Sequence, residues 1–342
     1  MFNKGGLNRA ALRADTLLLL TAAIWGFGFV AQRSGMEYVG PFTFNGVRFI
    51  LGSLFLLPFI FIRRKIYSIP GGFRRALPPC LLLGSVLFVA VLLQQFGILF
   101  TTAGNAGFIT GSYVVFTPIF GIFLGRKTGY ATWIGSILTL AGLYFLSAAG
   151  RASINPGDII IVASAFFWTV HVLVIDRLMN SDMKRKSSVD PLELSAGQFA
   201  VCGLLMMFGA LFAETRVVST VRLFNPALLA AGLFEWQPFP DLVLALVAGT
   251  TRLSPEMLIP ILYGGLCSVG IAYTLQVIAQ RDAPPAHATI ILCFEGCFAA
   301  LGGVLLLSEK IGAWTLLGFV LMLAGMLATQ WEIITKKTTR RP

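Results

Sequence analysis

The sequence predicts an all-α integral membrane protein with ten transmembrane helices, arranged as two inverted five-helix repeats. Three observations lead to this fold class: an apolar composition, basic residues that gather between apolar runs, and an internal repeat. The 342 residues are 56% hydrophobic and 12% charged, with a mean hydropathy of +0.82. A soluble chain carries about 25% charged residues, so the composition indicates a lipid environment.

Ten apolar runs are long enough to cross a bilayer core, which requires about 20 residues per helix and sometimes only about 17. Each run is expected to be helical, because an open sheet cannot satisfy its backbone hydrogen bonds in lipid. The expected spans are residues 16–34, 41–62, 76–97, 103–125, 130–149, 157–178, 191–213, 255–279, 286–307 and 312–332.

The stretch 214–254 is apolar in part but is not counted as a span. Glu235, Pro238, Pro240 and Asp241 interrupt it, and an eleventh span would place the basic C-terminal end outside. We expect two short helices that lie on the outer membrane surface, in a loop insertion that is dispensable for the fold.

The placement of Lys and Arg predicts the orientation. With the N-terminus in the cytoplasm, nineteen of the 26 basic residues fall in cytoplasmic segments, six fall in outer segments, and Arg48 lies inside a span. Cytoplasmic loops of membrane proteins carry such an excess. Residues 1–15 and the basic tail 333–342 are therefore both expected in the cytoplasm. Because the net charge of +11 follows from these clusters, nucleic acid is not expected as a partner.

The chain repeats itself. The segment "RKTGYATWIGSILTLAG" at 126–142 matches "EKIGAWTLLGFVLMLAG" at 309–325 with a constant offset of 183 in the numbering. Trp25 corresponds to Trp168 in a second pair of similar segments, with a different offset of 143. The two repeats are assigned to residues 16–150 and 157–332.

Each repeat holds five helices, an odd number, so the second repeat enters the membrane from the opposite side. Inverted repeats are the usual build of secondary transporters, in which the substrate site lies near the membrane midplane between the halves. The repeat therefore favours a transporter that works by alternating access.

At these residues the chain resembles the ten-helix EamA group of the drug/metabolite transporter superfamily. The resemblance rests on a central Trp in the first helix of each half, on the pair Arg48–Phe49, and on the run 283–325, which contains Glu295 and Glu309. It covers about 16–332. The chain departs from the group at Gly296, where the group usually has Pro, and in its longer loop 214–254.

The resemblance implies a multi-pass carrier of small metabolites in the bacterial cytoplasmic (inner) membrane, often an exporter of amino acids or drug-like compounds.

Polar and aromatic residues at matched depths in the two halves are the candidate substrate-binding residues, because a central cavity between repeats needs such groups from both. The matched pairs are Arg48 with Gln198, Ser112 with Glu295, Gln94 with Gln276, and Trp25 with Trp168; Tyr113 and His171 lie beside them in the sequence.

Most of these candidates also have a purely structural interpretation. Gln94 and Gln276 can form hydrogen bonds between helices, and the two Trp residues can pack in the core. His171 can be a satisfied interior histidine or a proton shuttle. The sequence leaves these alternatives open.

Arg48 and Glu295 are the opposite charges that the sequence places deep in the membrane. An isolated charge there costs at least about 3 kcal/mol, and such residues usually mark a functional site. We expect both to face one central cavity, where they meet directly, through water, or through the carboxylate and amine of a substrate. Such a cavity suits a zwitterion such as an amino acid.

Other classes of protein are less well supported. A receptor or a membrane-embedded enzyme remains the alternative, but the chain has no H-E-x-x-H or G-x-S-x-G motif, so we expect no enzyme. Cys293 and Cys297 share a helix face, but no His or carboxylate completes a plausible ligand set with them, so no metal or cofactor is expected. Proton coupling through Glu295 and passive transport both stay open, as does the oligomeric state.

Overall fold

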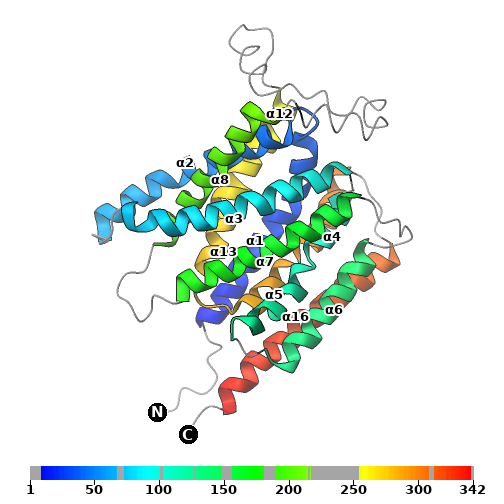
Figure 1. Cartoon of the computed structure of the whole chain (residues 1–342). Helices are drawn as coiled ribbons and strands as arrows, with labels where there is room; N and C mark the ends of the chain where they lie inside the picture. The colour runs from blue at the N-terminus through cyan, green and yellow to red at the C-terminus, as the bar shows by residue number, and fades with distance from the viewer. Residues whose placement is uncertain are drawn as a thin grey trace.

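The protein is a bundle of helices, several of them long enough to cross a membrane (Figure 1). The computed structural model describes residues 9–67, 73–100, 103–125, 128–147, 156–180, 190–214, 216, 254–307 and 312–339. Its helices are α1 (Arg9–Gly35), α2 (Pro41–Tyr67), α3 (Phe73–Phe100), α4 (Ala103–Thr110), α5 (Tyr113–Phe123), α6 (Tyr130–Ser147), α7 (Pro156–Asn180), α8 (Pro191–Phe212), α12 (Pro255–Leu262), η2 (Tyr263–Tyr273), α13 (Thr274–Ala279), α14 (Pro285–Leu292), α15 (Glu295–Leu307) and α16 (Ala313–Thr339).

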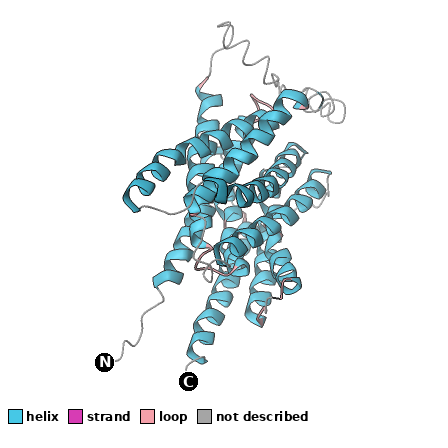
Figure 2. Ribbon diagram, turned by 60° about the vertical axis from the view of Figure 1, so that its left-hand side comes forward, coloured by secondary structure: helices cyan, strands magenta, loops and turns pink. Residues whose placement is uncertain are grey.

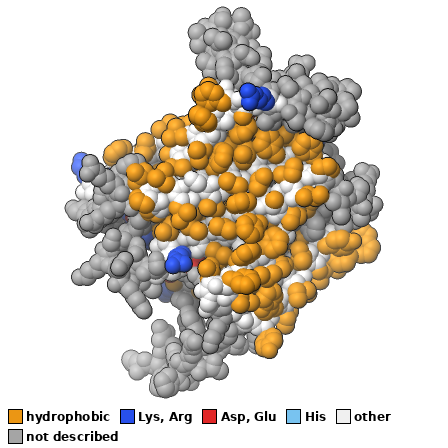
Figure 3. All heavy atoms as spheres, viewed as in Figure 1, with side chains coloured by type: hydrophobic (Ala, Val, Ile, Leu, Met, Phe, Trp, Pro, Cys, Tyr) orange, Lys and Arg blue, Asp and Glu red, His pale blue; other side chains and the backbone are white. Residues whose placement is uncertain are grey.

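The surface and the lengths of the helices make this a multi-pass membrane protein. Within the described residues, seven helices are long and apolar enough to cross a membrane, and three shorter apolar helices accompany them. Apolar side chains cover most of the face seen in Figure 3. The first turn of α1 and the last turn of α16 lie at the same end of the bundle (Figures 1 and 2). Since α16 continues to Thr339, much of the expected tail 333–342 is helical.

The fourth helix of each half is broken, which corrects the expectation of single helices at 103–125 and 286–307. In the first half α4 ends before α5 begins at Tyr113, and in the second α14 ends before α15 begins at Glu295. At the breaks, Ser112 N donates to Ile109 O (3.0 Å) and Phe294 N to Ile291 O (3.1 Å). These bonds reach back three residues instead of four, so the turn tightens between the two pieces of each helix.

The span 255–279 is helical throughout, but its middle, η2, is a π-helix. Glycines of η2 lie directly against α2. A Cβ added at Gly265 would lie 2.6 Å from Leu51 Cδ2, and one at Gly264 would lie 3.2 Å from Arg48 Cδ. The close approach of the two helices therefore places the η2 backbone next to the intramembrane arginine. Regular α-helix was expected here, and π segments are frequent at functional sites.

Helices α6 and α16, which carry the repeated motif, pack through their glycines. A Cβ on Gly142 would lie 2.6 Å from Gly318 O, and a Cβ on Gly325 would lie 2.7 Å from Gly135 O. The offset of 183 converts each contact into the other, since it relates Gly142 to Gly325 and Gly135 to Gly318. Small residues allow such close packing of helices in lipid.

Helices α2 and α8 are tied together where α2 ends and α8 begins. Arg63 Nη2 lies 3.1 Å from Asp190 Oδ2, and Arg64 Nε donates to Glu193 Oε1 at 2.8 Å. Both arginines are about one-third exposed, so each pair contributes little stability, at most about 1 kcal/mol.

The opposite ends of the same two helices are joined by Glu214. Its buried carboxylate accepts hydrogen bonds from Phe42 N (3.1 Å), Thr43 N (3.0 Å) and the Thr43 hydroxyl. It thus satisfies backbone donors that the first turn of α2 leaves free. Glu214, the first residue of the loop expected to be dispensable, therefore caps α2. The two surface helices expected in the loop lie outside the described residues.

Candidate functional site

A cavity with an empty volume of about 480 Å³ lies at the centre of the bundle. Seven of the ten residues predicted from the sequence line it, and they come from seven different helices. They are Trp25, Arg48, Gln94, Tyr113, Trp168, Gln276 and Glu295.

Three predicted residues do not line the cavity. Ser112 occupies the break between α4 and α5, and its buried hydroxyl has no hydrogen-bond partner among the described residues. His171 and Gln198 are fully buried and bond to each other, with 2.9 Å between Nε2 and Oε1. The structure therefore does not bring these three residues into the cavity.

The sequence prediction missed seven lining residues. They are Phe29, Gln32, Thr110, Val172, Ser268, Tyr273 and Leu292. For two of them, the repeat offset could have indicated that they line the cavity. The numbers of Phe29 and Val172 differ by 143, the same offset that relates Trp25 to Trp168. The prediction looked for matched polar residues, and apolar partners were overlooked.

Arg48 supplies the positive charge of the cavity. The side chain is 2% exposed, and its Nε donates to Asn45 Oδ1 at 2.8 Å. The guanidinium carbon lies 5.5 Å from the ring centroid of Phe44 and 5.0 Å from that of Phe49, within cation–π range. No described carboxylate lies within ion-pair distance of it. A buried guanidinium with unused donors is suited to an anionic ligand group.

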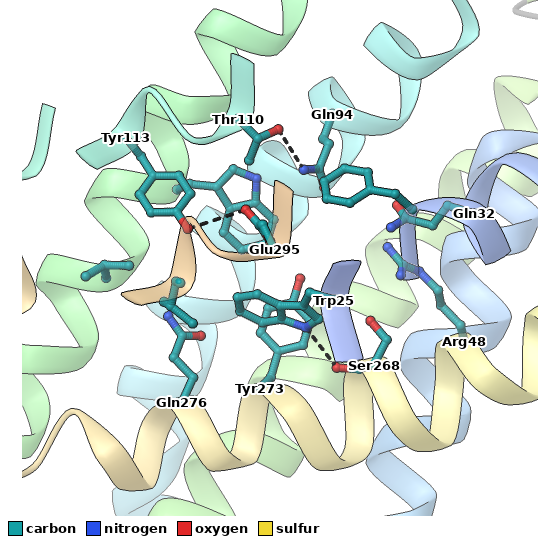
Figure 4. A pocket seen from close by; sticks show the side chains of 14 residues that line it. Trp25, Gln32, Arg48, Gln94, Thr110, Tyr113, Ser268, Tyr273, Gln276 and Glu295 are labelled. Atoms are coloured by element: carbon teal, nitrogen blue, oxygen red, sulfur yellow. Dashed lines mark hydrogen bonds between the residues drawn. The ribbon is translucent and has the colours of Figure 1, made fainter. Parts of the chain in front are cut away.

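Glu295 supplies the negative charge, on the other side of the cavity from Arg48 (Figure 4). It is the first residue of α15, and its Oε1 accepts a hydrogen bond from Tyr113 Oη at 3.4 Å. The direct pairing of Arg48 with Glu295, one of the expected arrangements, is therefore not present. The two charges lie apart with the cavity between them.

Aromatic rings from both halves form one wall of the cavity. Tyr273 lies 4.6 Å from Trp25 and 5.9 Å from Trp168, measured between ring centroids. Trp25 Nε1 donates to Ser268 O at 3.2 Å, which fixes the orientation of this ring. Figure 4 shows Trp25 and Tyr273 below Glu295 and to the left of Arg48. These rings offer an apolar surface for the body of a small amphipathic molecule.

The helix breaks correct one of the predicted residue matches. Helices α4 and α14 have equal lengths, and their first residues are related by an offset of 182, as are the first residues of α5 and α15. Tyr113 is therefore the counterpart of Glu295, and Ser112 is the counterpart of Phe294. Gln94 and Gln276 show the same offset. The offset of 183 holds for the motifs at 126–142 and 309–325, so the second half has one additional residue between Glu295 and position 309.

Several counterparts in the two halves touch each other. Tyr113 bonds to Glu295, and Cys293 Sγ lies 3.3 Å from Gly111 O, a pair with the same offset of 182. The rings of Trp25 and Trp168 lie 6.3 Å apart. Residues that pair with their own counterparts lie close to the line that relates the two halves, so the cavity is built around this line.

A membrane-embedded bundle with a polar cavity at its centre has the architecture of a membrane transporter. The chain belongs to the EamA-like transporter family, whose model matches residues 12–148 and 238–330, more than half of the chain. Membership of this family makes it a transporter and not an enzyme.

Individual relatives agree with this assignment. The chain is 28% identical to an uncharacterised transporter of Archaeoglobus fulgidus, over 94% of this chain and 87% of the relative. It is 26% identical to the uncharacterised inner membrane transporter YedA of Escherichia coli, over 78% and 92%. A solved crystal structure superposes with a TM-score of 0.70 at 16% identity, over 95% of this chain and 98% of the other, which shows a shared fold.

Proposed function

We propose that the protein is a secondary transporter of small metabolites that carry a carboxylate, such as amino acids. It works by alternating access at a midplane site between two inverted five-helix repeats. The observation that carries the proposal is Arg48, a buried cation that faces the central cavity and has no acidic partner among the described residues. An intramembrane charge without such a partner is best explained by a ligand that supplies one.

The inverted-repeat part of the proposal is supported by the contacts between counterparts. Gly142 packs on Gly318, and the counterpart of this contact is Gly325 on Gly135. Two contacts that exchange under the repeat offset are expected from a two-fold relation between the halves. Such an axis has to lie in the membrane plane when the halves have opposite orientation.

The positions of the two charges support this substrate class. Arg48 and Glu295 lie on opposite sides of the cavity, whose lining also includes the aromatic rings of Trp25, Trp168 and Tyr273. A zwitterion can place its carboxylate on the arginine and its amine near the glutamate. Glu295 is also the candidate carrier of a coupled proton. The direction that we propose is export across the cytoplasmic membrane, with both chain ends in the cytoplasm.

The test is the flux of radiolabelled amino acids in proteoliposomes, comparing the parent chain with Arg48→Gln. Glutamine keeps a donor at the position but removes the charge. The loss of hydrogen bonds between charged groups is worth about 1.5–3 kcal/mol. Transport efficiency should therefore fall about 10- to 150-fold.

The matched control is Arg177→Gln, which removes the same charge from an exposed position of α7. Its flux should equal that of the parent. Unchanged flux in Arg48→Gln at normal expression would contradict the binding role of Arg48.

A further inference from the structure

The cavity is asymmetric about the line that relates the two halves. On α1 it is lined by Trp25, Phe29 and Gln32, which lie on successive turns toward the end of the helix. On α7 the cavity is lined by Trp168 and Val172, which are the counterparts of Trp25 and Phe29 at the offset of 143. The counterpart of Gln32 is Ile175, which is fully buried in the core and does not reach the cavity.

The second helix of each half shows the same difference. Arg48 of α2 lines the cavity, whereas its counterpart Gln198 of α8 is fully buried away from it. In inverted repeats, counterparts away from the axis lie toward opposite membrane faces. The cavity therefore extends from the middle toward one face only, the face at which α1 ends and α2 begins.

The closed side contains polar groups without partners. His171 Nε2 donates to Gln198 Oε1 at 2.9 Å, since a carbonyl oxygen can only accept. In the uncharged ring this makes His171 Nδ1 an acceptor, and Gln198 Nε2 remains a donor; neither has a partner among the described residues. Both side chains are fully buried. A buried polar group without a partner is destabilising, and bound water or a ligand is one explanation for it.

We propose that His171 and Gln198 form a second subsite, which is closed in this conformation and opens when the cavity faces the cytoplasm. It is the counterpart of the Arg48 subsite, and the inference rests on the alternating-access function proposed above. The subsite offers one acceptor and one donor and no charge. It therefore suits water or an uncharged polar group, and it holds a carboxylate more weakly than Arg48 does.

The subsite gives the two faces of the transporter different chemistry. On the outer side a cation binds the carboxylate of the substrate. On the cytoplasmic side a neutral histidine–glutamine pair replaces the cation, so a substrate anion exchanges with water more readily there.

Thiol labelling tests the proposal without a transported substrate. The background is a chain in which the two half-buried cysteines are replaced, Cys267→Ala and Cys297→Ala. The matched pair is Gln32→Cys and Ile175→Cys, and Leu87→Cys, fully buried in the core, is the control. A membrane-impermeant maleimide is applied to right-side-out and to inside-out vesicles.

The proposal predicts that Gln32→Cys reacts from the outer face and Ile175→Cys from the cytoplasmic face. Each should react at least about ten times faster than Leu87→Cys, because a water-filled path is required for modification. In the double variant, prior modification of the outer cysteine with a bulky maleimide should slow the reaction at position 175 about ten-fold.

Two results would overturn the proposal. In the first, the Ile175→Cys thiol is as unreactive as Leu87→Cys from both faces. In the second, the labelling rate at position 175 is unchanged when the outer cysteine has been modified. These outcomes are separable from failure of the proposed substrate class. Labelling can follow the predicted pattern while amino-acid flux is absent, and in that case only the substrate assignment fails.

Discussion

The contact between α6 and α16 allows a quantitative test of the relation between the halves. We consider Gly142→Ala and Gly325→Ala. In each variant the new Cβ would lie within 2.7 Å of backbone or side-chain atoms of the facing helix, including the carbonyl oxygens of Gly318 and Gly135. Because the obstacle is backbone, no side-chain rotation can relieve it, and the two helices must separate.

The expected destabilisation follows from two opposing terms. Overpacking of a tight interface costs about 1–3 kcal/mol, whereas alanine is favoured over glycine in a helix interior by about 1 kcal/mol. The control Gly28→Ala isolates the second term, because its Cβ would meet the nearest atom at 3.6 Å, an ordinary contact. Gly142→Ala and Gly325→Ala should therefore each be about 1–3 kcal/mol less stable than Gly28→Ala.

Thermal unfolding of the purified protein in detergent measures the difference. At roughly 2 °C per kcal/mol for a large domain, the two variants should melt about 2–6 °C below Gly28→Ala. They should also resemble each other, because the repeat offset makes their contacts equivalent. Equal melting of all three variants would refute the close packing, and a large loss in only one of the pair would refute the equivalence.

Two further predictions concern the ends of the helices. Glu214→Ala should lower the stability by about 1–3 kcal/mol in the same melting assay, because it leaves buried backbone donors of α2 unpaired; Glu214→Gln keeps an acceptor and should lose less, and equal stability of Glu214→Ala and the parent would show that the cap is dispensable. For the orientation, a cysteine at position 65 should react with impermeant maleimide from the cytoplasmic side only and one at position 216 from outside only, and the reverse pattern would invert the proposed topology.

The sequence by itself determined the apolar spans and the repeat. Hydropathy depends on composition within a window, so runs such as 191–213 were located to within a few residues of α8. Trp25 and Trp168 were singled out from the sequence because each is a Trp in the middle of the first helix of its half, and both line the cavity. Arg48 and Glu295 could also be found from the sequence alone, because each is a charged residue that interrupts an apolar run.

The tertiary structure decided which side chains meet. Helix breaks and the π segment of η2 arise where backbones press together, and a hydropathy window does not register such contacts. A shift of one residue turns a side chain by about 100° around its helix, which is why Tyr113 and not Ser112 faces Glu295. Gln198 was a reasonable candidate from its match with Arg48, but the cavity reaches only one of the two positions. The position of a residue within an apolar run can be read from the sequence. The packing of helices that are distant in sequence sets the direction in which a side chain points and the face to which the cavity extends.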